Sequence, residues 1–449
     1  MRDWVLSTPS RTAPIPNPQS PIAPEDRAQL TFERLFGPEF GHGKTFDLPR
    51  LKAALHALGA PQLRLPPVIH IAGTNGKGST IAFMRAIAEA AGLRVHAFTK
   101  PHLFALRERF LVAGDVASDD ALIGAAERVA SVSTELTQFD AQAAAALLLF
   151  SEAPAGVVLL ETGMGGRDDS TNVIENAALT VITPIALDHQ VELGPRLADI
   201  AAHKAGILKP AAPALVARQQ DAAREIIEAR AEAIGAPLLR QGVEWDAYAH
   251  AGRLVVQTET RVLDLPPPTL AGAHQIDNAG LACAAMLAWR DLPDEAFADG
   301  VAGARLQARL QPLTRGPLSA PIRATGGEVW VDGAHNAHGA QALARALHAM
   351  QRRRPAPTIA VVGMRARKDA DSFIGAIAGA VNHVIGVPLS EAHVAPVMMT
   401  AICDLFGIES SAAPSFEAAM QNAAQFPAPR VLICGSFLLA AEALRVESG

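Results

Sequence analysis

The chain has 449 residues, which is enough for two or three domains, and 49% of them are hydrophobic. Charged residues make up 19% and the formal net charge is −6 at pH 7, as in a globular protein with a large core. This acidic balance excludes the basic surface that binds nucleic acid or an anionic membrane.

A proline-rich tail, residues 1–24, lacks the apolar segment of an export signal. No apolar run reaches the roughly 18–20 residues that span a bilayer. The cysteines Cys283, Cys403 and Cys434 are far apart and form no CxxC pair, which indicates free thiols in a reducing compartment. We therefore expect a cytoplasmic protein without a membrane partner.

Helices are predicted over residues 25–36 and 46–58, the second ending before Gly59 and Pro61. From Val68 onward, short β-branched runs alternate with helical patterns. The predicted strands are residues 68–73, 94–99, 156–163 and 179–189, and the predicted helices are residues 79–92, 141–154 and 221–237. Strands that are apolar along their whole length predict a parallel sheet covered by helices on both faces.

The pattern changes twice in the rest of the chain. Residues 242–268 alternate polar and apolar side chains, which predicts a small β-rich insertion before a helix at residues 271–289. A second alternation of strands and helices begins at Gly327. Residues 305–320 contain glycine and prolines without a clear period, so they predict a linker between two α/β domains, residues 25–304 and 321–449.

The stretch GTNGKGST joins a predicted strand to a predicted helix. Its glycines allow the backbone to approach a ligand closely, and amides at the start of the helix attract phosphate oxygens. The lysine can reach terminal phosphates, and either hydroxyl can bind Mg²⁺. The spacing differs from the common GxxxxGK[ST], but the position between strand and helix favours nucleotide binding over a plain glycine-rich turn. The candidate nucleotide-binding residues are Gly73, Thr74, Asn75, Gly76, Lys77, Gly78, Ser79 and Thr80.

Charged and imidazole side chains follow later strands of the same predicted sheet. Glu161 ends one strand, Asp188 and His189 follow the next, and Lys204 lies further on. Ligands gather at the carboxyl ends of parallel strands, so a carboxylate and an imidazole there are candidate Mg²⁺ ligands. Each residue alone also fits a structural role, as a rim charge, a buried histidine or a surface lysine. Their ordered succession favours a site.

Eight stretches, taken in order, resemble the folylpolyglutamate synthase/dihydrofolate synthase branch of the Mur ligases. They are HIAGTNGKGST, PHL followed by RERF, LLETGMGGRDDSTNV, ITPIALDH, HKAGILKP, HQIDNA, VDGAHN and ICGSFLLA. The resemblance runs from about residue 50 to the C-terminus. It implies that the first domain is a Mur-ligase-type ATP-binding domain, with a mostly parallel sheet like that of P-loop ATPases, and that the second is a Rossmann-like α/β domain.

The resemblance implies an ATP-dependent amide ligase of folate biosynthesis. In that family, ATP phosphorylates the carboxylate of dihydropteroate or of a folate, and the amine of L-glutamate displaces phosphate from the acyl phosphate. The implied cofactors are ATP and two Mg²⁺ ions, and the family also allows a K⁺ ion. The implied partners are small molecules, and a monomer is the family expectation. Which of the two acids is used, or whether both are, stays open.

Residue roles follow from matching positions. Lys77 corresponds to the lysine at the β- and γ-phosphates, and Ser79, Glu161 and His189 correspond to Mg²⁺ ligands. Lys204 corresponds to a lysine that becomes carbamylated, which turns a cation into a carboxylate near a second metal ion. The implied catalytic residues are therefore Lys77, His189 and Lys204. Further nucleotide contacts correspond to Gln275, Asn278, Arg309, Asp332 and His335, and substrate contacts to Lys100, Pro101, His102, Asp169, Ser170 and Asn172.

Several positions depart from the family pattern. Lys100 stands where relatives carry a serine that ligates Mg²⁺, and an ammonium group cannot ligate a metal. Three interpretations are open: Thr99 takes over by a small shift, Lys100 contacts phosphate or the substrate acid, or this metal site is weak. Four more positions differ from the usual glutamate, leucine, glutamate and proline, namely Asp140, Asp168, His203 and Ala337.

Two other functions stay open at this point. A Mur-type ligase acting on another acid, such as a cell-wall precursor, would share the phosphate loop. Only a short segment precedes that loop, which weighs against an added domain for a UDP-sugar. A non-catalytic relative that binds nucleotide or folate would account for the altered residues Lys100 and Asp168.

Overall fold

The computed structural model describes residues 26–38 and 47–449. The predicted tail, residues 1–24, lies outside them. Within the described ranges, no helix combines the length and the apolar character needed to cross a bilayer.

The described chain divides into two compact units, and one of the points where it passes between them falls inside a helix, between Ile276 and Asp277. Each unit carries helices on a mostly parallel sheet, which confirms the predicted fold class of two α/β domains. The N-terminal unit holds residues 26–38, 47–267 and 277–304, and the C-terminal unit holds residues 268–276 and 305–449.

The N-terminal unit contains an eight-stranded sheet in the order β4-β3-β2-β5-β1-β6-β7-β8. The six strands from β2 to β8 in this order run parallel, whereas β3 and β4 form an antiparallel edge. β1, β2 and β5 are buried along their whole length, which explains their apolar sequences. The strands are β1 (Val68–Ala72), β2 (Val95–Phe98), β3 (Phe110–Val112), β4 (Asp115–Val116), β5 (Val157–Glu161), β6 (Leu179–Ile182), β7 (Ala214–Val216) and β8 (Leu238–Arg240).

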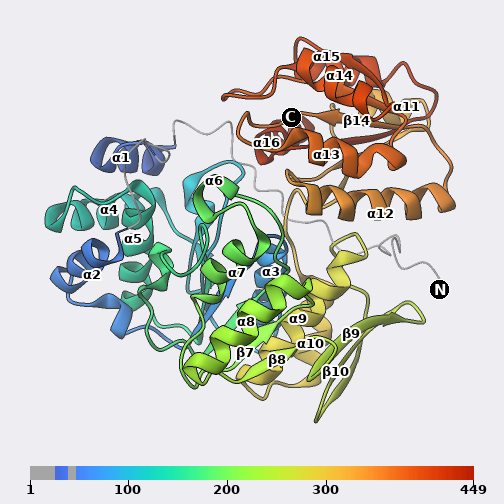
Figure 1. The fold of residues 1–449 in the computed structure, drawn as a ribbon. Helices are drawn as coiled ribbons and strands as arrows, with labels where there is room; N and C mark the ends of the chain where they lie inside the picture. Colours follow the sequence, from blue (N-terminus) through green and yellow to red (C-terminus); the bar gives the residue numbers. More distant parts are fainter. Residues whose placement is uncertain (1–25, 39–46) are drawn as a thin grey trace. The chain divides into compact units, whose positions relative to one another are not determined.

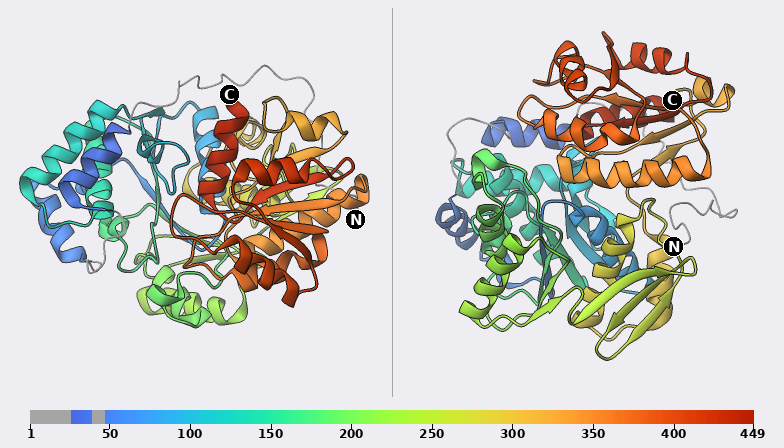
Figure 2. Two further views of the ribbon diagram at one scale, coloured as in Figure 1. Left: turned by 90° about the horizontal axis from the view of Figure 1, so that it is seen from above. Right: turned by 45° about the vertical axis from the view of Figure 1, so that its right-hand side comes forward.

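Helices cover both faces of this sheet, as predicted (Figures 1 and 2). α4 and α5 lie on one side of it, and α3, α9 and α10 lie on the other. The helices are α1 (Arg27–Phe36), α2 (Leu48–Ala57), α3 (Lys77–Ala90), α4 (Asp119–Val132), α5 (Gln138–Glu152), α6 (Gln190–Leu193), α7 (Leu197–Ala205), α8 (Asp221–Ile234), α9 (His274–Trp289) and α10 (Asp294–Gly303).

Two hydrophobic cores share one face of the sheet. The first packs α1, α2, α4 and α5 against β5 side chains that include Leu160, and the second packs α7 and α8 against β6 and β7, including Ile182. In the strand register, His70 of β1 is the partner of Leu160, and Ala72 is the partner of Ile182. Because side chains alternate between the faces of a strand, His70 points to the face that carries both cores.

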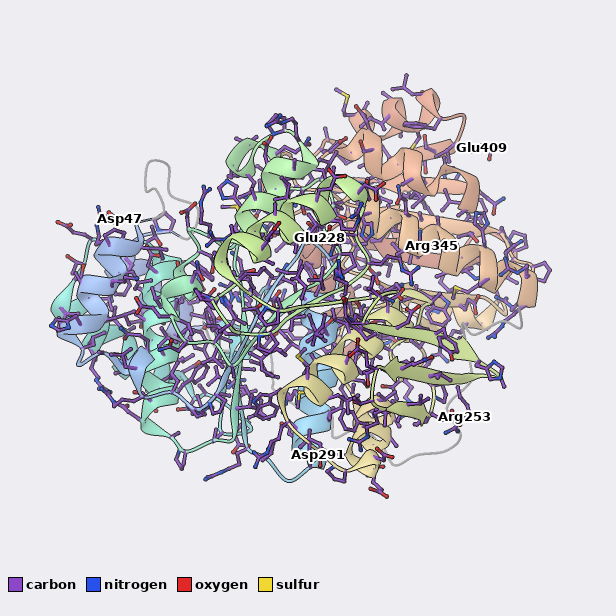
Figure 3. All side chains as sticks on the ribbon, turned by 60° about the horizontal axis from the view of Figure 1, so that its bottom comes forward. Asp47, Glu228, Arg253, Asp291, Arg345 and Glu409 are labelled. Atoms are coloured by element: carbon purple, nitrogen blue, oxygen red, sulfur yellow. The ribbon has the colours of Figure 1, made fainter. Side chains whose placement is uncertain are left out.

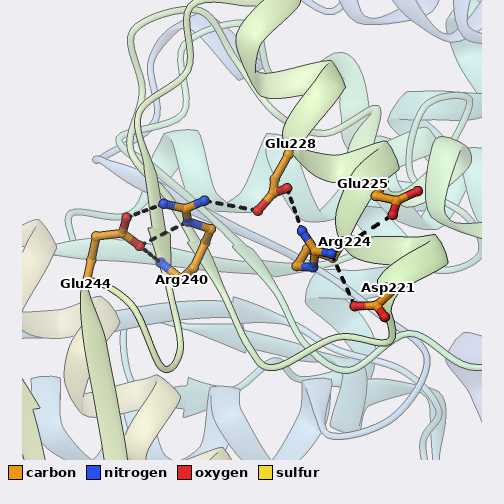
Figure 4. Close-up of polar contacts among 6 residues, drawn as sticks. All are labelled: Asp221, Arg224, Glu225, Glu228, Arg240 and Glu244. Carbon is orange, nitrogen blue, oxygen red and sulfur yellow. Dashed lines mark hydrogen bonds and ion pairs between the residues drawn. The ribbon is translucent and has the colours of Figure 1, made fainter.

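The predicted β-rich insertion is a three-stranded antiparallel sheet of β9 (Trp245–His250), β10 (Arg253–Thr258) and β11 (Val262–Leu265). Arg253 of the central strand β10, which is labelled in Figure 3, pairs with Asp264 of the edge strand β11 at 2.7 Å on the surface. Beside it, Arg240 of β8 lies between Glu244 and Glu228 at 2.6 and 3.0 Å and ties α8 to the sheet (Figure 4). Such half-exposed pairs stabilise a fold by about 1 kcal/mol or less each.

The C-terminal unit contains a six-stranded sheet in the order β12-β13-β17-β14-β15-β16. β12 is antiparallel to β13, and the other neighbours are parallel. β12 lies inside residues 305–320, so the segment predicted as a linker instead belongs to this unit and supplies an edge strand. The strands are β12 (Gln311–Leu313), β13 (Glu328–Val331), β14 (Thr358–Val362), β15 (His383–Gly386), β16 (Glu409–Ala412) and β17 (Arg430–Cys434).

A core of Trp330, Leu347, Phe373 and neighbouring apolar side chains packs α12, α13 and α14 against this sheet. Arg430 of β17 is fully buried, and its guanidinium donates hydrogen bonds to Glu328 on β13 and to the carbonyl of Arg354. The helices are α11 (Ala320–Ala324), α12 (Ala337–Arg353), α13 (Ala370–Ile377), α14 (Pro396–Leu405), α15 (Phe416–Ala423) and α16 (Phe437–Ser448).

Candidate functional site

The glycine-rich turn joins β1 directly to α3, which begins at Lys77, two residues earlier than predicted. Gly73 and Gly76 have positive φ angles of 148° and 92°. A Cβ atom on Gly73 would overlap the side chain of Thr183, and one on Gly76 would lie 2.5 Å from Oδ1 of Asn278. Both positions therefore require glycine, because backbone conformation and space exclude a side chain.

Two amides of this turn are used within the protein. The amides of Thr74 and Asn75 donate to the carbonyl of Pro184, at 3.0 and 3.4 Å, and the Thr74 hydroxyl donates to the carbonyl of Ala186. The assignment of Thr74 and Asn75 to the nucleotide stays a prediction, and the observed partner of both amides lies within the protein. The first turn of α3, including Lys77, is the part suited to phosphate, because amides there have no acceptor within the helix.

Glu161 at the end of β5 lies beside the phosphate loop, as its place after a parallel strand predicts. Its buried carboxylate is 3.8 Å from the Lys77 ammonium, and its other oxygen accepts a hydrogen bond from the backbone amide of Lys100 at 3.1 Å. The Lys77 ammonium also donates to the carbonyl of Gly73 at 3.1 Å. A buried carboxylate is thus held within reach of the lysine assigned to the phosphates.

Lys204 of α7 reaches the same loop. Its ammonium donates to the carbonyl of Gly73 at 2.7 Å, so Lys204 and Lys77 share one acceptor. Burial, and then repulsion from Lys77, lower the pKa of Lys204 to about 7, although Asp188 and Asp169 oppose the shift. A large fraction of the side chain is therefore a neutral amine near pH 7, the form that reacts with CO₂.

The pKa of Lys204 predicts how stability depends on pH. Between about pH 7 and the ordinary lysine value of 10.5, the folded protein binds fewer protons here than the unfolded chain, so the free energy of unfolding rises with pH. Relative to Lys204→Met in CO₂-free buffer, the wild type should gain about 2 kcal/mol between pH 7 and 9. Urea unfolding at both pH values measures this difference. A pH-independent difference would contradict the lowered pKa.

Lys100 lies above an aromatic ring at the edge of the site. Its ammonium is 4.6 Å from the ring centroid of Phe139, and its charge opposes the rise that burial causes in the pKa of Asp169. A Cβ atom on Gly163 would overlap the Phe139 ring, so this ring also packs against the start of the loop after β5. Lys100 is therefore a positioned cation next to that loop.

The loop of residues 163–172, called here the acid loop, directs several predicted substrate residues inward. Asp169 and Ser170 are each only 1% exposed. Asp169 accepts hydrogen bonds from the amide of Met164 and from Thr171, and the Ser170 hydroxyl donates to Asp140 at 2.6 Å. Their roles as direct substrate contacts stay predictions, and their observed partners lie within the protein.

Other predicted substrate residues also have internal partners. Asn172 donates to the carbonyls of Arg167 and Gly206 and accepts from Lys209. His102, after the Lys100–Pro101 peptide, accepts a hydrogen bond on Nδ1 from Arg109 at 3.0 Å.

Two departures from the family pattern meet at the rim of the acid loop. The carboxylate of Asp168 is 3.6 Å from Nδ1 of His203, the residue before Lys204. Asp168 also pairs with Arg167 at 3.0 Å. Burial, followed by the charge of Arg167, lowers the pKa of His203, so its imidazole is neutral at pH 7. The two altered residues are therefore neighbours in space.

His189 stands at the start of α6 with a left-handed φ of 53°. Its imidazole lies 4.0 Å from the Asp188 carboxylate and 3.9 Å from that of Glu192. Its approach to Glu161 stays a prediction. Among the residues that the structure describes, no group of three His, Cys, Asp or Glu side chains forms a metal site. Glu161 still fits a Mg²⁺ ion, because Mg²⁺ beside a nucleotide takes most of its ligands from phosphate oxygens and water.

In the C-terminal unit, predicted nucleotide residues gather around the end of β13. Asp332 is buried, which raises the pKa of its carboxyl group, and it accepts from the amides of Leu310 and Ala334 at 2.6 and 2.7 Å. Arg309 and His335 both pack on the ring of Phe437, at 4.8 and 5.7 Å.

The two remaining candidates lie on α9. Gln275 contacts the imidazole of His274 in the C-terminal unit, and Asn278 belongs to the N-terminal unit beside Gly76. His274 is not among the residues predicted from the sequence, and burial lowers its pKa to about 4.

Comparison with known proteins gives a consistent result. The chain matches the Mur ligase middle domain over residues 71–286 and the Mur ligase glutamate ligase domain over residues 321–437. It is 32% identical over 412 residues to a dihydrofolate synthase/folylpolyglutamate synthase of Escherichia coli K12, covering 90% of this chain and 92% of that protein.

Solved structures are similar along the same length. E. coli FolC in complex with DHPP and ADP has a TM-score of 0.83 at 30% identity, covering 95% of this chain and 99% of that one. A bifunctional folylpolyglutamate synthase/dihydrofolate synthase with Mn, AMPPNP and L-glutamate bound has a TM-score of 0.79 at 29% identity, covering 90% and 94%. With both Mur ligase domains present, this chain belongs to the dihydrofolate synthase/folylpolyglutamate synthase family of Mur ligases.

Proposed function

We propose that this protein is an ATP-dependent ligase that joins L-glutamate to the carboxylate of a pterin-type or folate-type acid. The observation that carries the proposal is that Lys77 and Lys204 share the carbonyl of Gly73, with the Glu161 carboxylate 3.8 Å from Lys77. Relatives that cover nearly the whole chain bind ADP, AMPPNP, Mn, DHPP or L-glutamate, which supports the same ligands here.

The reaction requires a leaving group, because an amine cannot displace oxide from a carboxylate. The acid oxygen takes the γ-phosphoryl group of ATP, ADP leaves, and the glutamate nitrogen attacks the acyl carbon, loses a proton and expels phosphate. Lys77 and the first turn of α3 would hold the β- and γ-phosphates in line with the acid. A divalent ion bound at Glu161 would supply charge neutralisation between phosphate and acid.

Two features of the metal chemistry stay predictions. We infer that Mg²⁺ is the physiological ion and that the neutral amine of Lys204 takes up CO₂ as a carbamate, which its pKa of about 7 favours. Mass spectrometry of intact protein in bicarbonate buffer should show a labile gain of one carboxyl group that is absent in Lys204→Met. A K⁺ ion and a monomeric state rest on the family resemblance alone.

The decisive test is an assay of ADP release with purified protein, L-glutamate and either dihydropteroate or tetrahydrofolate. Turnover with one or both acids supports the proposal and shows which reaction is catalysed. Titration calorimetry on the same samples detects binding without turnover. Binding of ATP and acid without ADP release, or no effect of either acid, would overturn the ligase proposal.

Lys100→Ser tests the altered metal-ligand position. If the ammonium over Phe139 contacts phosphate or the acid, removing it should lower kcat/KM by about 100-fold, or ~2.7 kcal/mol of transition-state stabilisation. If Lys100 only occupies the place of a metal ligand, the variant should be as active as the wild type or more so, with tighter Mn²⁺ binding. Steady-state kinetics and Mn²⁺ titration distinguish the two results.

A further inference from the structure

Ser170 and Thr171 fasten the acid loop to the core, and Asp169 is bonded within the loop. Ser170 donates to Asp140 on α5, Asp169 accepts from Met164 and Thr171, and the Thr171 hydroxyl lies 2.8 Å from Nε2 of His70 on β1. Each of these side chains is at most 5% exposed. The loop is therefore attached to a helix and to the central strand by side-chain hydrogen bonds as well as by its ends.

With Asp169 as a carboxylate that accepts backbone N–H groups on both oxygens, the direction of the hydrogen bonds between His70 and Asp169 follows from the proton count. The Thr171 hydroxyl has one proton, and it is donated to Asp169. Nε2 of His70 must therefore carry a proton and donate it to the Thr171 oxygen. Burial lowers the pKa of His70 to about 3, so the imidazole is neutral and its other nitrogen carries no proton. The order of donation is His70 to Thr171 to Asp169.

A histidine at this position lowers the stability of the fold relative to an apolar residue. Among the residues that the structure describes, Nδ1 of His70 has no hydrogen-bond partner, and leaving a buried acceptor unsatisfied is destabilising. An apolar side chain would avoid that cost in a strand whose other residues are all apolar. What the imidazole adds is a single directed hydrogen bond to the acid loop.

His70 is also close to the phosphate loop along the chain. Only Ile71 and Ala72 separate it from Gly73, whose carbonyl is the acceptor shared by Lys77 and Lys204. β1 is central in the sheet and pairs with β5, the strand that leads into the acid loop. One rigid strand thus presents the phosphate loop at its end and fixes the acid loop through its side chain.

We propose that His70 is a positioning residue which, through Thr171 and Asp169, holds the acid loop in the conformation that receives the acid substrate. The identity of that substrate rests on the proposed function, whereas the link between His70 and the loop does not. In this role His70 contacts neither ATP nor the acid. It acts by setting the loop against the phosphate loop before the acid binds.

Two matched pairs of variants test the link. His70→Leu removes the donor and fills a similar volume, whereas His70→Gln keeps an N–H donor close to the place of Nε2. Thr171→Val removes the hydroxyl at constant shape, whereas Thr171→Ser keeps it. His70→Leu and Thr171→Val should each raise KM for the acid about tenfold, with KM for ATP within twofold of the wild type. His70→Gln and Thr171→Ser should stay within about threefold for both substrates.

Hydrogen exchange of the ligand-free protein gives a readout that needs no activity. The amides of Met164 and Thr171 donate to Asp169, so they should exchange at least about tenfold faster in His70→Leu, while amides of α8 keep their wild-type rates. The double variant His70→Leu/Thr171→Val should change KM no more than either single variant, because both remove the same link.

The results separate a positioning role from a purely structural one. Unchanged exchange in the acid loop and unchanged KM for the acid would overturn the proposal, and so would equal losses for both substrates with faster exchange throughout β1. If the wild type ligates neither acid, the proposed function fails, and exchange in the acid loop alone then decides whether His70 holds it.

Discussion

Lys77→Ala should lower kcat/KM for ligation by at least about 10³-fold, or ~4 kcal/mol, with little change in the fold. Lys77 is the cation at the first turn of α3, and its side chain is 16% exposed, so it can exchange its contacts with Gly73 and Glu161 for phosphate oxygens. The same substitution removes a repulsion that lowers the pKa of Lys204. That pKa should therefore rise toward the ordinary lysine value.

Coupled ADP-release kinetics, thermal unfolding and nucleotide titration measure these effects. Lys52→Ala is the matched control, because Lys52 forms an exposed pair with Glu175 at 3.0 Å on the surface of the same unit. The control should keep full activity. A Lys77→Ala protein that ligates at near-normal rates would show that the glycine-rich turn does not hold the reacting phosphates.

Glu161→Gln should reduce kcat by about 10²–10³-fold and raise the Mg²⁺ concentration needed for half-maximal activity. The amide keeps the shape of the carboxylate and an oxygen that can accept from the backbone of Lys100, so the loop geometry persists. What disappears is the buried negative charge 3.8 Å from Lys77. Without this carboxylate, the site loses the negative charge that would attract a divalent ion.

Mn²⁺ binding in the presence of a non-hydrolysable ATP analogue, followed by paramagnetic resonance, reports this loss without turnover. Glu152→Gln is a suitable control, since Glu152 pairs with Arg128 at 2.6 Å on the surface. Equal Mn²⁺ affinity in Glu161→Gln and the wild type would remove Glu161 from the metal site.

Local sequence patterns predicted the parts of the site that depend on adjacent residues. The phosphate loop is visible because strand, glycines, lysine and helix follow one another within a few residues. Glu161 could be placed because parallel strands bring their carboxyl ends together, and the structure puts it beside Lys77. The insertion of residues 242–268 was predicted by its alternation and forms its own sheet.

Features that only tertiary contacts decide could not be predicted from the sequence. The amides of Thr74 and Asn75 donate hydrogen bonds to the carbonyl of Pro184, a residue more than 100 positions away in the sequence. Asp169 and Ser170 turn inward toward internal partners: Asp169 accepts from the Thr171 hydroxyl, and the Ser170 hydroxyl donates to Asp140.

Short elements were missed for a simpler reason. β12 has three residues, one of them Pro312, and is too short to show a period. Its place at the sheet edge tolerates proline, whose missing N–H would interrupt a central strand. His70 carried a usable signal, since it is one polar residue in a strand that is otherwise apolar.

The contact between Asp168 and His203 bears on how the acid loop could be engineered. Replacing His203 alone by glutamate would place its carboxylate next to that of Asp168. Replacing Asp168 alone by leucine would leave the His203 imidazole next to an apolar side chain. We therefore expect the effects of substitutions at these two positions to be non-additive. Any graft of the acid loop between this chain and a relative should therefore transfer the residues at positions 168 and 203 together.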